Sequence, residues 1–141
     1  MSTTKIALLV LAHEKLEQLA LVLNSLEHED IYFFVHIDKK VKTTSEQYGI
    51  FNQIRNCHVI TRDESMTLNW GGRSQVDAML LLLNKAYASQ VVIERFGFIS
   101  GADYPLITAD QLVVFFRNNE NEYIRVDRQI TEKNSNRITN L

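Results

Sequence analysis

The sequence predicts an α/β fold with one mainly parallel, doubly wound sheet and helices on both of its faces. Two observations predict it. Segments typical of strands alternate with segments typical of helices along the chain without a break. The first strand segment, residues 6–12, is apolar at every position, which is typical of a strand covered on both faces. We find no internal repeat or linker, so we expect one domain over residues 1–126 and a polar tail over residues 127–141.

Composition excludes several classes of protein. With 141 residues, 45% of them hydrophobic and 23% charged, the chain is long enough for a soluble domain with its own core. A net charge of -2 provides no basic field for nucleic acid or an anionic membrane. The single cysteine, Cys57, excludes an internal disulfide framework and fits a reducing compartment. No segment approaches the roughly 18 apolar residues of a membrane span. We therefore expect a cytoplasmic protein, either free or peripheral to the inner membrane face.

The first half of the chain is expected to form three strands and two helices. Leucines at 16, 19, 23 and 26 recur at helical spacing and predict a helix after the first strand. Residues 31–37 are aromatic and β-branched, which is typical of a central strand. A polar helix is expected over residues 45–54 and a short strand over residues 57–60.

The longest non-regular stretch is expected over residues 61–73. Trp70 is either a bulky packing anchor in this loop or a platform on which a ring can stack, and the Gly71-Gly72 pair is its hinge. Ser74 is a candidate N-cap for a helix through Ser89. The leucine run within that helix, residues 80–83, is expected to be largely buried.

The last part of the chain is expected to hold two strands and one helix. Residues 96–100 read as a buried strand that opens into a rigid loop, where Gly101 permits a tight or left-handed turn. Pro105 excludes a helix that begins before it. The capping-box spacing at residues 108–111 predicts a helix through Phe116, and residues 122–126 are expected to form a fifth strand.

Three of the predicted strands end in polar clusters, at residues 13–15, 38–40 and 100–103. Parallel strands share one carboxyl edge, where open α/β sheets bind ligands, so these clusters are expected to converge on a cleft. Each residue also has a structural interpretation. His13 fits a hydrogen-bonded loop histidine, and Asp38 fits a turn cap. Lys40 fits a solvated lysine as well as one that faces phosphates, whereas His36, inside a strand, is expected to be structural.

Several chemistries lack their motifs. The sequence has neither the G-x-G-x-x-G of a dinucleotide fold nor a P-loop, and no H-E-x-x-H, paired C-x-x-C or G-x-S-x-G. After the fourth predicted strand, many metal-dependent sugar-nucleotide transferases carry a D-x-D motif, but this chain has the single carboxylate of Asp103. One carboxylate is poor provision for Mg²⁺, so we expect no metal site.

Four motifs in order resemble the core-2/I-branching β-1,6-N-acetylglucosaminyltransferases, a family that also includes peptide xylosyltransferases and bacterial relatives. The motifs are Leu-Ala-His-Glu-Lys at 11–15, Val-His-Ile-Asp-Lys-Lys at 35–40, Asn-Trp-Gly-Gly-Arg-Ser at 69–74 and Ser-Gly-Ala-Asp-Tyr-Pro-Leu at 100–106. The resemblance covers residues 5–126. It implies a GT-A-like, Rossmann-like fold, an inverting mechanism, a UDP-sugar donor with N-acetylglucosamine as the expected sugar, a glycan or polysaccharide acceptor, and no cofactor or metal ion.

The resemblance also implies roles for individual residues. Asp38 would contact the uracil or ribose, and Leu11 and His13 would wall the nucleotide pocket. Asp103 would lie near the donor, and Trp70 with Gly71 would belong to a loop that closes over the nucleotide. The predicted donor-binding set is Leu11, His13, Asp38, Lys40, Trp70, Gly71, Gly101 and Asp103.

The chain also departs from that family. Such enzymes are about twice as long, and their later half supplies the carboxylate base and the basic residues that grip the diphosphate. The catalytic base is therefore unassigned here and expected beyond Leu141, with residues 127–141 as the start of a missing half. The alternatives are a non-catalytic nucleotide-sugar-binding module, or a truncated, inactive fragment. A receiver-type signalling domain ranks low, because His13-Glu14 occupies the place of its acidic pair.

Overall fold

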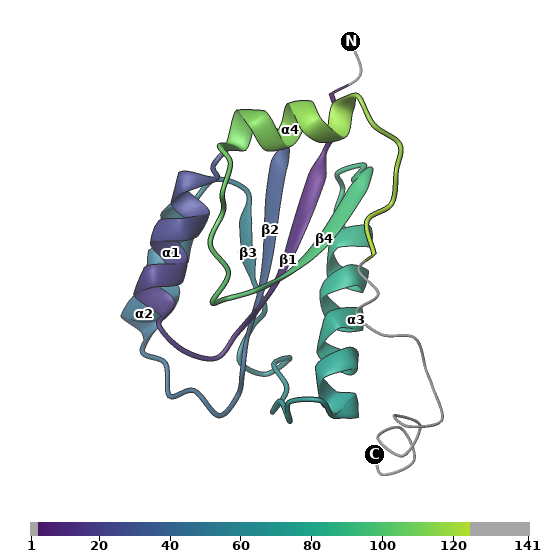
Figure 1. Cartoon of the computed structure of the whole chain (residues 1–141). Coiled ribbons are helices and arrows are strands. Elements are labelled where there is room, and N and C mark those ends of the chain that lie inside the picture. The colour runs from purple at the N-terminus through teal and green to yellow at the C-terminus, as the bar shows by residue number, and fades with distance from the viewer. Residues whose placement is uncertain (1–2, 125–141) are drawn as a thin grey trace, which may run out of the picture.

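Four parallel strands form one sheet in the order β3-β2-β1-β4 (Figure 1). They are β1 (Ile6–Ala12), β2 (Ile31–Ile37), β3 (Cys57–Val59) and β4 (Arg95–Ser100). The central strand β1 pairs in parallel with β2 on one side and with β4 on the other. This computed structural model describes residues 3–124, and it confirms the predicted α/β class with a parallel sheet.

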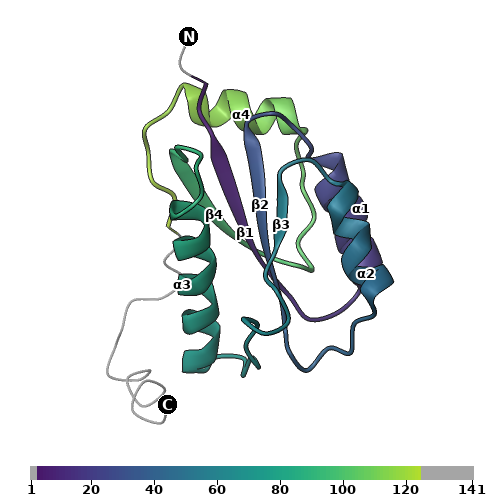
Figure 2. The same ribbon diagram turned by 180° about the vertical axis from the view of Figure 1, so that it is seen from behind.

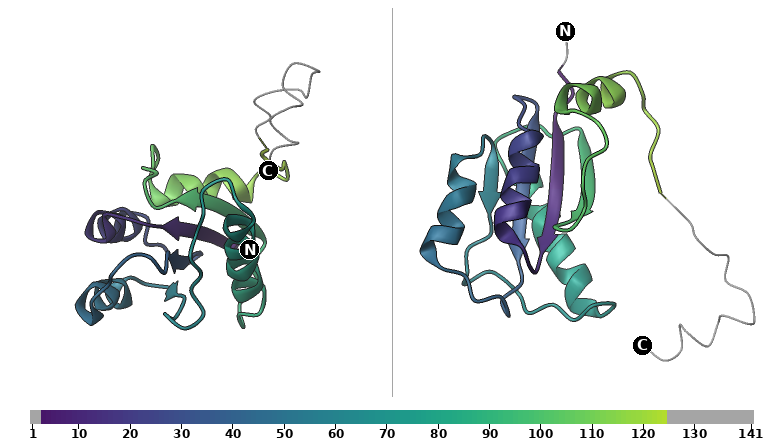
Figure 3. Two further views of the ribbon diagram at one scale, coloured as in Figure 1. Left: turned by 90° about the horizontal axis from the view of Figure 1, so that it is seen from below. Right: turned by 60° about the vertical axis from the view of Figure 1, so that its left-hand side comes forward.

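Helices cover both faces of the sheet, as Figures 2 and 3 show from behind and from below. One face carries α1 (Leu16–Ser25), α2 (Ser45–Gly49), the 3₁₀ turn η1 (Ile50–Gln53) and α4 (Ala109–Arg117), and the other carries α3 (Arg73–Tyr87). Because successive strand side chains point to opposite faces, β1 gives Leu8 and Val10 to one core and Leu9 and Leu11 to the other. All seven residues of β1 are buried, which explains its continuous apolar sequence.

Local sequence signals are confirmed at two helices. Leu16, Leu19 and Leu23 lie buried at helical spacing on the inner side of α1. At the start of α4, the hydroxyl of Thr108 accepts a hydrogen bond from the Gln111 backbone N–H at 3.2 Å. The Gln111 side chain accepts one in return from the Thr108 N–H at 2.9 Å. This is the predicted capping box.

The start of α3 differs from the prediction. Gly72, not Ser74, is the N-cap residue, and its backbone is extended. The Ser74 hydroxyl instead accepts a hydrogen bond from the backbone N–H of Asn69 at 2.9 Å. Ser74 therefore ties the preceding loop to the helix and leaves the helix end itself without a side-chain cap.

The leucine run of α3 is less buried than predicted. Leu82 is fully buried, but Leu80 is 51% exposed. The helix meets the sheet with one narrow face, on which Ala78, Leu82 and Ala86 recur every four residues. Consecutive leucines cannot all share one helical face, so the prediction for residues 80–83 was wrong.

Three other expectations need correction. The helix expected over residues 45–54 divides into α2 and η1. Strand β4 lies at the edge of the sheet, and its Phe96 and Phe98 are 38% and 46% exposed. It is therefore not the buried strand that its apolar sequence predicted. Residues 122–124 are not a strand, and the rest of the expected fifth strand, with the tail over residues 127–141, lies outside the described residues. None of the helices within residues 3–124 has the length and apolar character needed to cross a membrane.

Candidate functional site

The polar clusters at the carboxyl ends of the strands do converge. The Asp38 N–H donates to the carbonyl of Ala12 at 2.8 Å, and the Gly101 N–H donates to the carbonyl of Leu11 at 2.8 Å. These bonds extend the pairing of β2 and β4 with β1 by one residue beyond the strands. The chain after β2 and the chain after β4 therefore leave the sheet on either side of the end of β1.

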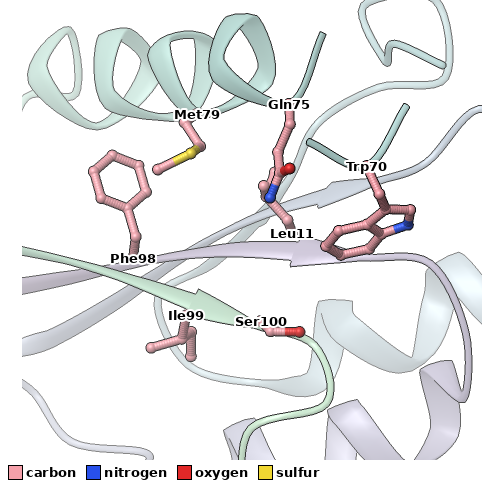
Figure 4. Close-up of a pocket in the computed structure, with 7 residues that line it drawn as sticks. All are labelled: Leu11, Trp70, Gln75, Met79, Phe98, Ile99 and Ser100. Carbon is pink, nitrogen blue, oxygen red and sulfur yellow. The ribbon is translucent and has the colours of Figure 1, made fainter. Parts of the chain in front are cut away.

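A cavity of about 160 Å³ opens at this edge, between α3 and the ends of β1 and β4 (Figure 4). Its lining residues are Leu11, Trp70, Gln75, Met79, Phe98, Ile99 and Ser100. The strand order reverses at β1, and in open α/β sheets such a reversal is where ligands bind. Within the described residues, no charged side chain lines the cavity.

Trp70 forms one wall of the cavity and contacts His13. The two ring centroids are 4.8 Å apart, with an interplanar angle of 74°, so the rings meet edge to face. Trp70 is nevertheless 57% exposed. It is therefore not the packing anchor of its loop, and the alternative of a platform for a ring remains.

The anchor of the loop is Leu68, which is 2% exposed. Its backbone N–H donates to Oδ1 of Asp38 at 3.3 Å, and its carbonyl accepts from Nζ of Lys40 at 2.5 Å. Nζ of Lys40 also donates a hydrogen bond of 3.3 Å to Oδ1 of Asn69. The structure thus turns Lys40 toward the loop rather than toward the cavity.

Asp38 is buried, with 4% of its surface exposed. Oδ1 accepts from the backbone N–H of Lys40 at 2.9 Å as well as from Leu68. The carbonyl of Asp38 accepts from the guanidinium of Arg62 at 3.3 Å, which also donates to the carbonyl of Lys39. Among the described residues, no side chain or backbone group donates to Oδ2. One oxygen of Asp38 holds the loop, and the other is free for a ligand.

His36 lies beneath the same loop and is fully buried. Its Nε2 accepts a hydrogen bond from the backbone N–H of Met66 at 2.9 Å, so the imidazole is neutral with its proton on Nδ1. Burial lowers the pKa of His36, and the nearby Asp38 carboxylate opposes that shift. The expected structural role of His36 is confirmed.

The two glycines of the predicted site serve different purposes. Gly71 has a φ of 73°, in the left-handed region that favours glycine. Gly101 lies in a turn and has no positive φ, so of the two turns that the sequence allowed there, the tight one and not the left-handed one is present. A Cβ at Gly101 would lie 3.1 Å from Cα of Ala12 and 3.3 Å from the carbonyl oxygen of Leu11. The end of β1 therefore lies so close to Gly101 that a side chain there would force its neighbours to shift.

Asp103 does not itself line the Trp70 cavity, although it contacts Ser100, which does. Its Oδ2 accepts from the backbone N–H of Ser100 at 2.7 Å, which closes the turn after β4. Asp103 lines a second, apolar cavity of about 190 Å³ with Leu8 and Leu112, on the opposite face of the sheet. In residues 3–124, no three His, Cys, Asp or Glu side chains are grouped as metal ligands.

Leu11 and Trp70 of the predicted site line the cavity, as does Ser100 of the predicted polar cluster, but Gln75, Met79, Phe98 and Ile99 were not predicted. Phe98 and Ser100 belong to a strand whose alternate residues share a face, so the period of two was an available signal. Gln75 follows the Gly71-Gly72 pair by three residues, in the first turn of the helix. Nothing in the amino-acid sequence alone shows that the Gln75 side chain reaches the cavity.

Comparison with known proteins gives two similarities. A family model described as "Branch: Core-2/I-Branching enzyme" matches residues 6–141. The chain is also similar to "Xylosyltransferase 1" of Rattus norvegicus, with 27% identity over 113 residues. That match covers 79% of this chain but 14% of the rat protein, so the chain spans a small part of the length of this relative.

Proposed function

Because the chain belongs to the Core-2/I-branching enzyme family, we propose that it is the donor-binding part of an inverting glycosyltransferase. The observation that carries this proposal is the Trp70 cavity at the carboxyl edge of the sheet, beside the strand-order reversal. An apolar slot with an exposed tryptophan suits a flat ring or the apolar face of a sugar.

The proposed donor is a UDP-sugar. The free oxygen of Asp38 would accept a hydrogen bond from the uracil or the ribose, while Leu11 and His13 would wall the nucleotide. N-acetylglucosamine is the sugar that the family resemblance favours. Xylose is the alternative, since the rat relative is named a xylosyltransferase. The acceptor would be a glycan or polysaccharide hydroxyl.

In the proposed reaction a carboxylate deprotonates the acceptor hydroxyl, which attacks the anomeric carbon of the donor as UDP leaves. Neither Asp38 nor Asp103 lines the Trp70 cavity, where the donor ring would bind. We therefore place the base outside residues 3–124. Metal-independent transfer requires protein cations at the leaving diphosphate. Lys40 is held by the loop, and within the described residues no Lys or Arg lines the Trp70 cavity, so we place these cations outside that lining.

A second candidate is a nucleotide-sugar-binding module without catalysis. One observation favours it: within the described residues, no carboxylate lines the Trp70 cavity. Both candidates bind a donor, and they differ in whether the protein transfers the sugar.

The proposal is tested by titrating the chain with UDP-N-acetylglucosamine, UDP-xylose and GDP-mannose while tryptophan fluorescence is recorded. Trp70 is the only tryptophan, so the signal arises at the cavity. We expect both UDP-sugars to change the emission and GDP-mannose to leave it unchanged. Equal responses to all three would contradict a uridine site. Release of UDP in the presence of a glycan acceptor would then favour the transferase over the binding module.

A further inference from the structure

Gln75 extends from the first turn of α3 into the Trp70 cavity. Figure 4 shows its side chain above Leu11, between Met79 and Trp70. Its Oε1 accepts a hydrogen bond from the backbone N–H of Gly71 at 3.1 Å. A backbone N–H can only donate, so the amide oxygen must face Gly71 and the amide nitrogen must point elsewhere.

Two side chains of α3 hold the backbone on both sides of Trp70. The Ser74 hydroxyl accepts a hydrogen bond from the N–H of Asn69, which precedes Trp70. The Gln75 side chain accepts one from the N–H of Gly71, which follows Trp70. The turn is closed by a bond of 2.9 Å from the Gly72 N–H to the Asn69 carbonyl. The indole is 57% exposed and contacts His13 by its edge, so these backbone contacts on both sides of Trp70 help to fix its position.

The amide nitrogen of Gln75 is an unused donor in a mostly apolar cavity. No described residue accepts a hydrogen bond from Nε2, and the other polar side-chain groups in the lining are the hydroxyl of Ser100 and the indole N–H of Trp70. A donor at the wall of an apolar slot is satisfied best by an oxygen of a bound ligand, because displacing water without replacing its hydrogen bond costs free energy.

We propose that Gln75 has two functions: Oε1 positions the Trp70 loop, and Nε2 donates to a carbonyl or hydroxyl oxygen of a ring bound against Trp70. The positioning function stands on the geometry of the free protein. The recognition function rests on the proposed donor site and extends it, by naming the side chain that selects a ring with an acceptor oxygen.

Two substitutions separate these functions. Gln75→Glu keeps an oxygen that accepts from the Gly71 N–H but removes the donor, whereas Gln75→Met removes both. Gln18→Met, on the exposed side of α1, is the matched control. The first readout is acrylamide quenching of Trp70 fluorescence without ligand. The second is the Kd for UDP measured by calorimetry. Thermal unfolding of each variant checks that it is folded.

We expect Gln75→Met to raise the quenching constant and to weaken UDP binding by about tenfold or more, the equivalent of one hydrogen bond. We expect Gln75→Glu to keep the wild-type quenching constant and still to weaken UDP binding by about tenfold. The Gln18→Met control should match the wild type in both readouts.

Each function has its own contradicting result. Wild-type quenching in folded Gln75→Met would overturn the positioning function, whatever happens with the ligand. A wild-type Kd in Gln75→Glu would overturn the recognition function while leaving the donor site intact. If UDP fails to bind even the wild type, the donor site and the recognition function fail together. The quenching comparison still decides the positioning function.

Discussion

The backbone N–H of Met66 donates a hydrogen bond of 2.9 Å to Nε2 of His36, and this bond joins β2 to the loop that carries Trp70. The bond requires the neutral imidazole, because a protonated ring has no acceptor nitrogen. Burial favours the same neutral form, with Asp38 as the opposing charge. Protonation of this buried ring would therefore break one of the bonds that hold the loop against the sheet, while the bonds of Leu68 with Asp38 and Lys40 remain.

We predict that the protein loses stability as the pH falls below about 6.5, the usual pKa of a histidine. The folded state keeps His36 neutral to a lower pH than the unfolded state does. The unfolded state therefore binds more protons in this window, and the free energy of unfolding falls with falling pH. Between pH 7.5 and 5.5 this loss is at most about 1.4 kcal/mol from His36. Urea unfolding at the two pH values measures it.

His36→Gln is the control for this pH effect, because glutamine offers an acceptor oxygen but does not titrate. Its unfolding free energy should change less between the two pH values than that of the wild type. The other three histidines are common to both proteins, so the difference isolates His36. An identical pH dependence in the two proteins would contradict the assignment.

Asp38→Ala is predicted to destabilise the protein by about 1–3 kcal/mol, because it leaves the buried N–H of Leu68 and the partly buried N–H of Lys40 without their acceptor. Asp38→Asn keeps the Oδ1 acceptor and should retain most of the stability while weakening UDP binding. Thermal unfolding and calorimetry on both variants check this. Equal stability of Asp38→Ala and wild type would contradict it.

Gly101→Ala is predicted to destabilise the protein by about 1–3 kcal/mol through overpacking, because the new Cβ would press on Leu11 and Ala12 at the end of β1. Gly49→Ala is the matched control. No atom lies within 4 Å of its added Cβ, and its helical backbone should gain up to about 1 kcal/mol. Urea unfolding of the two variants should therefore give shifts of opposite sign. Changes of the same sign in the free energy of unfolding would contradict this explanation of Gly101.

The thiol of Cys57 is predicted to be unreactive in the folded protein. Burial raises its pKa from 9.0 to about 12. The thiolate fraction at pH 8 is then about a thousandfold lower than for an unshifted thiol, and the thiolate is the reactive form. Reaction with a chromogenic disulfide reagent should be slow in buffer and fast in urea. Comparable rates in both would show that the thiol is accessible and ionised.

The sequence was sufficient for the strands that are buried on both faces. The continuous apolar run of β1 has one physical explanation, a central parallel strand, and the structure confirms it. The sequence was not sufficient for β4, because an apolar run with Phe96 and Phe98 reads the same whether the strand is buried or lies at an exposed edge. Exposure there depends on what lies beside the strand, which local patterning does not record.

The convergence of the polar clusters was predictable, because parallel strands must share a carboxyl edge. The contacts that hold the loop were not. His36 and Met66 lie 30 residues apart, as do Asp38 and Leu68, and no local rule pairs them. Gly101 was singled out correctly for a turn, but its purpose is close approach to Ala12, which only the packed backbone reveals.

The most direct test of the donor site is a calorimetric titration of the chain with UDP, repeated after treatment with EDTA. The proposal predicts saturable binding with the same Kd in both buffers, because the site would be formed by protein groups without a metal ion. Binding that disappears with EDTA would contradict the metal-independent site. Absence of binding in both buffers by the folded chain would contradict the donor site itself.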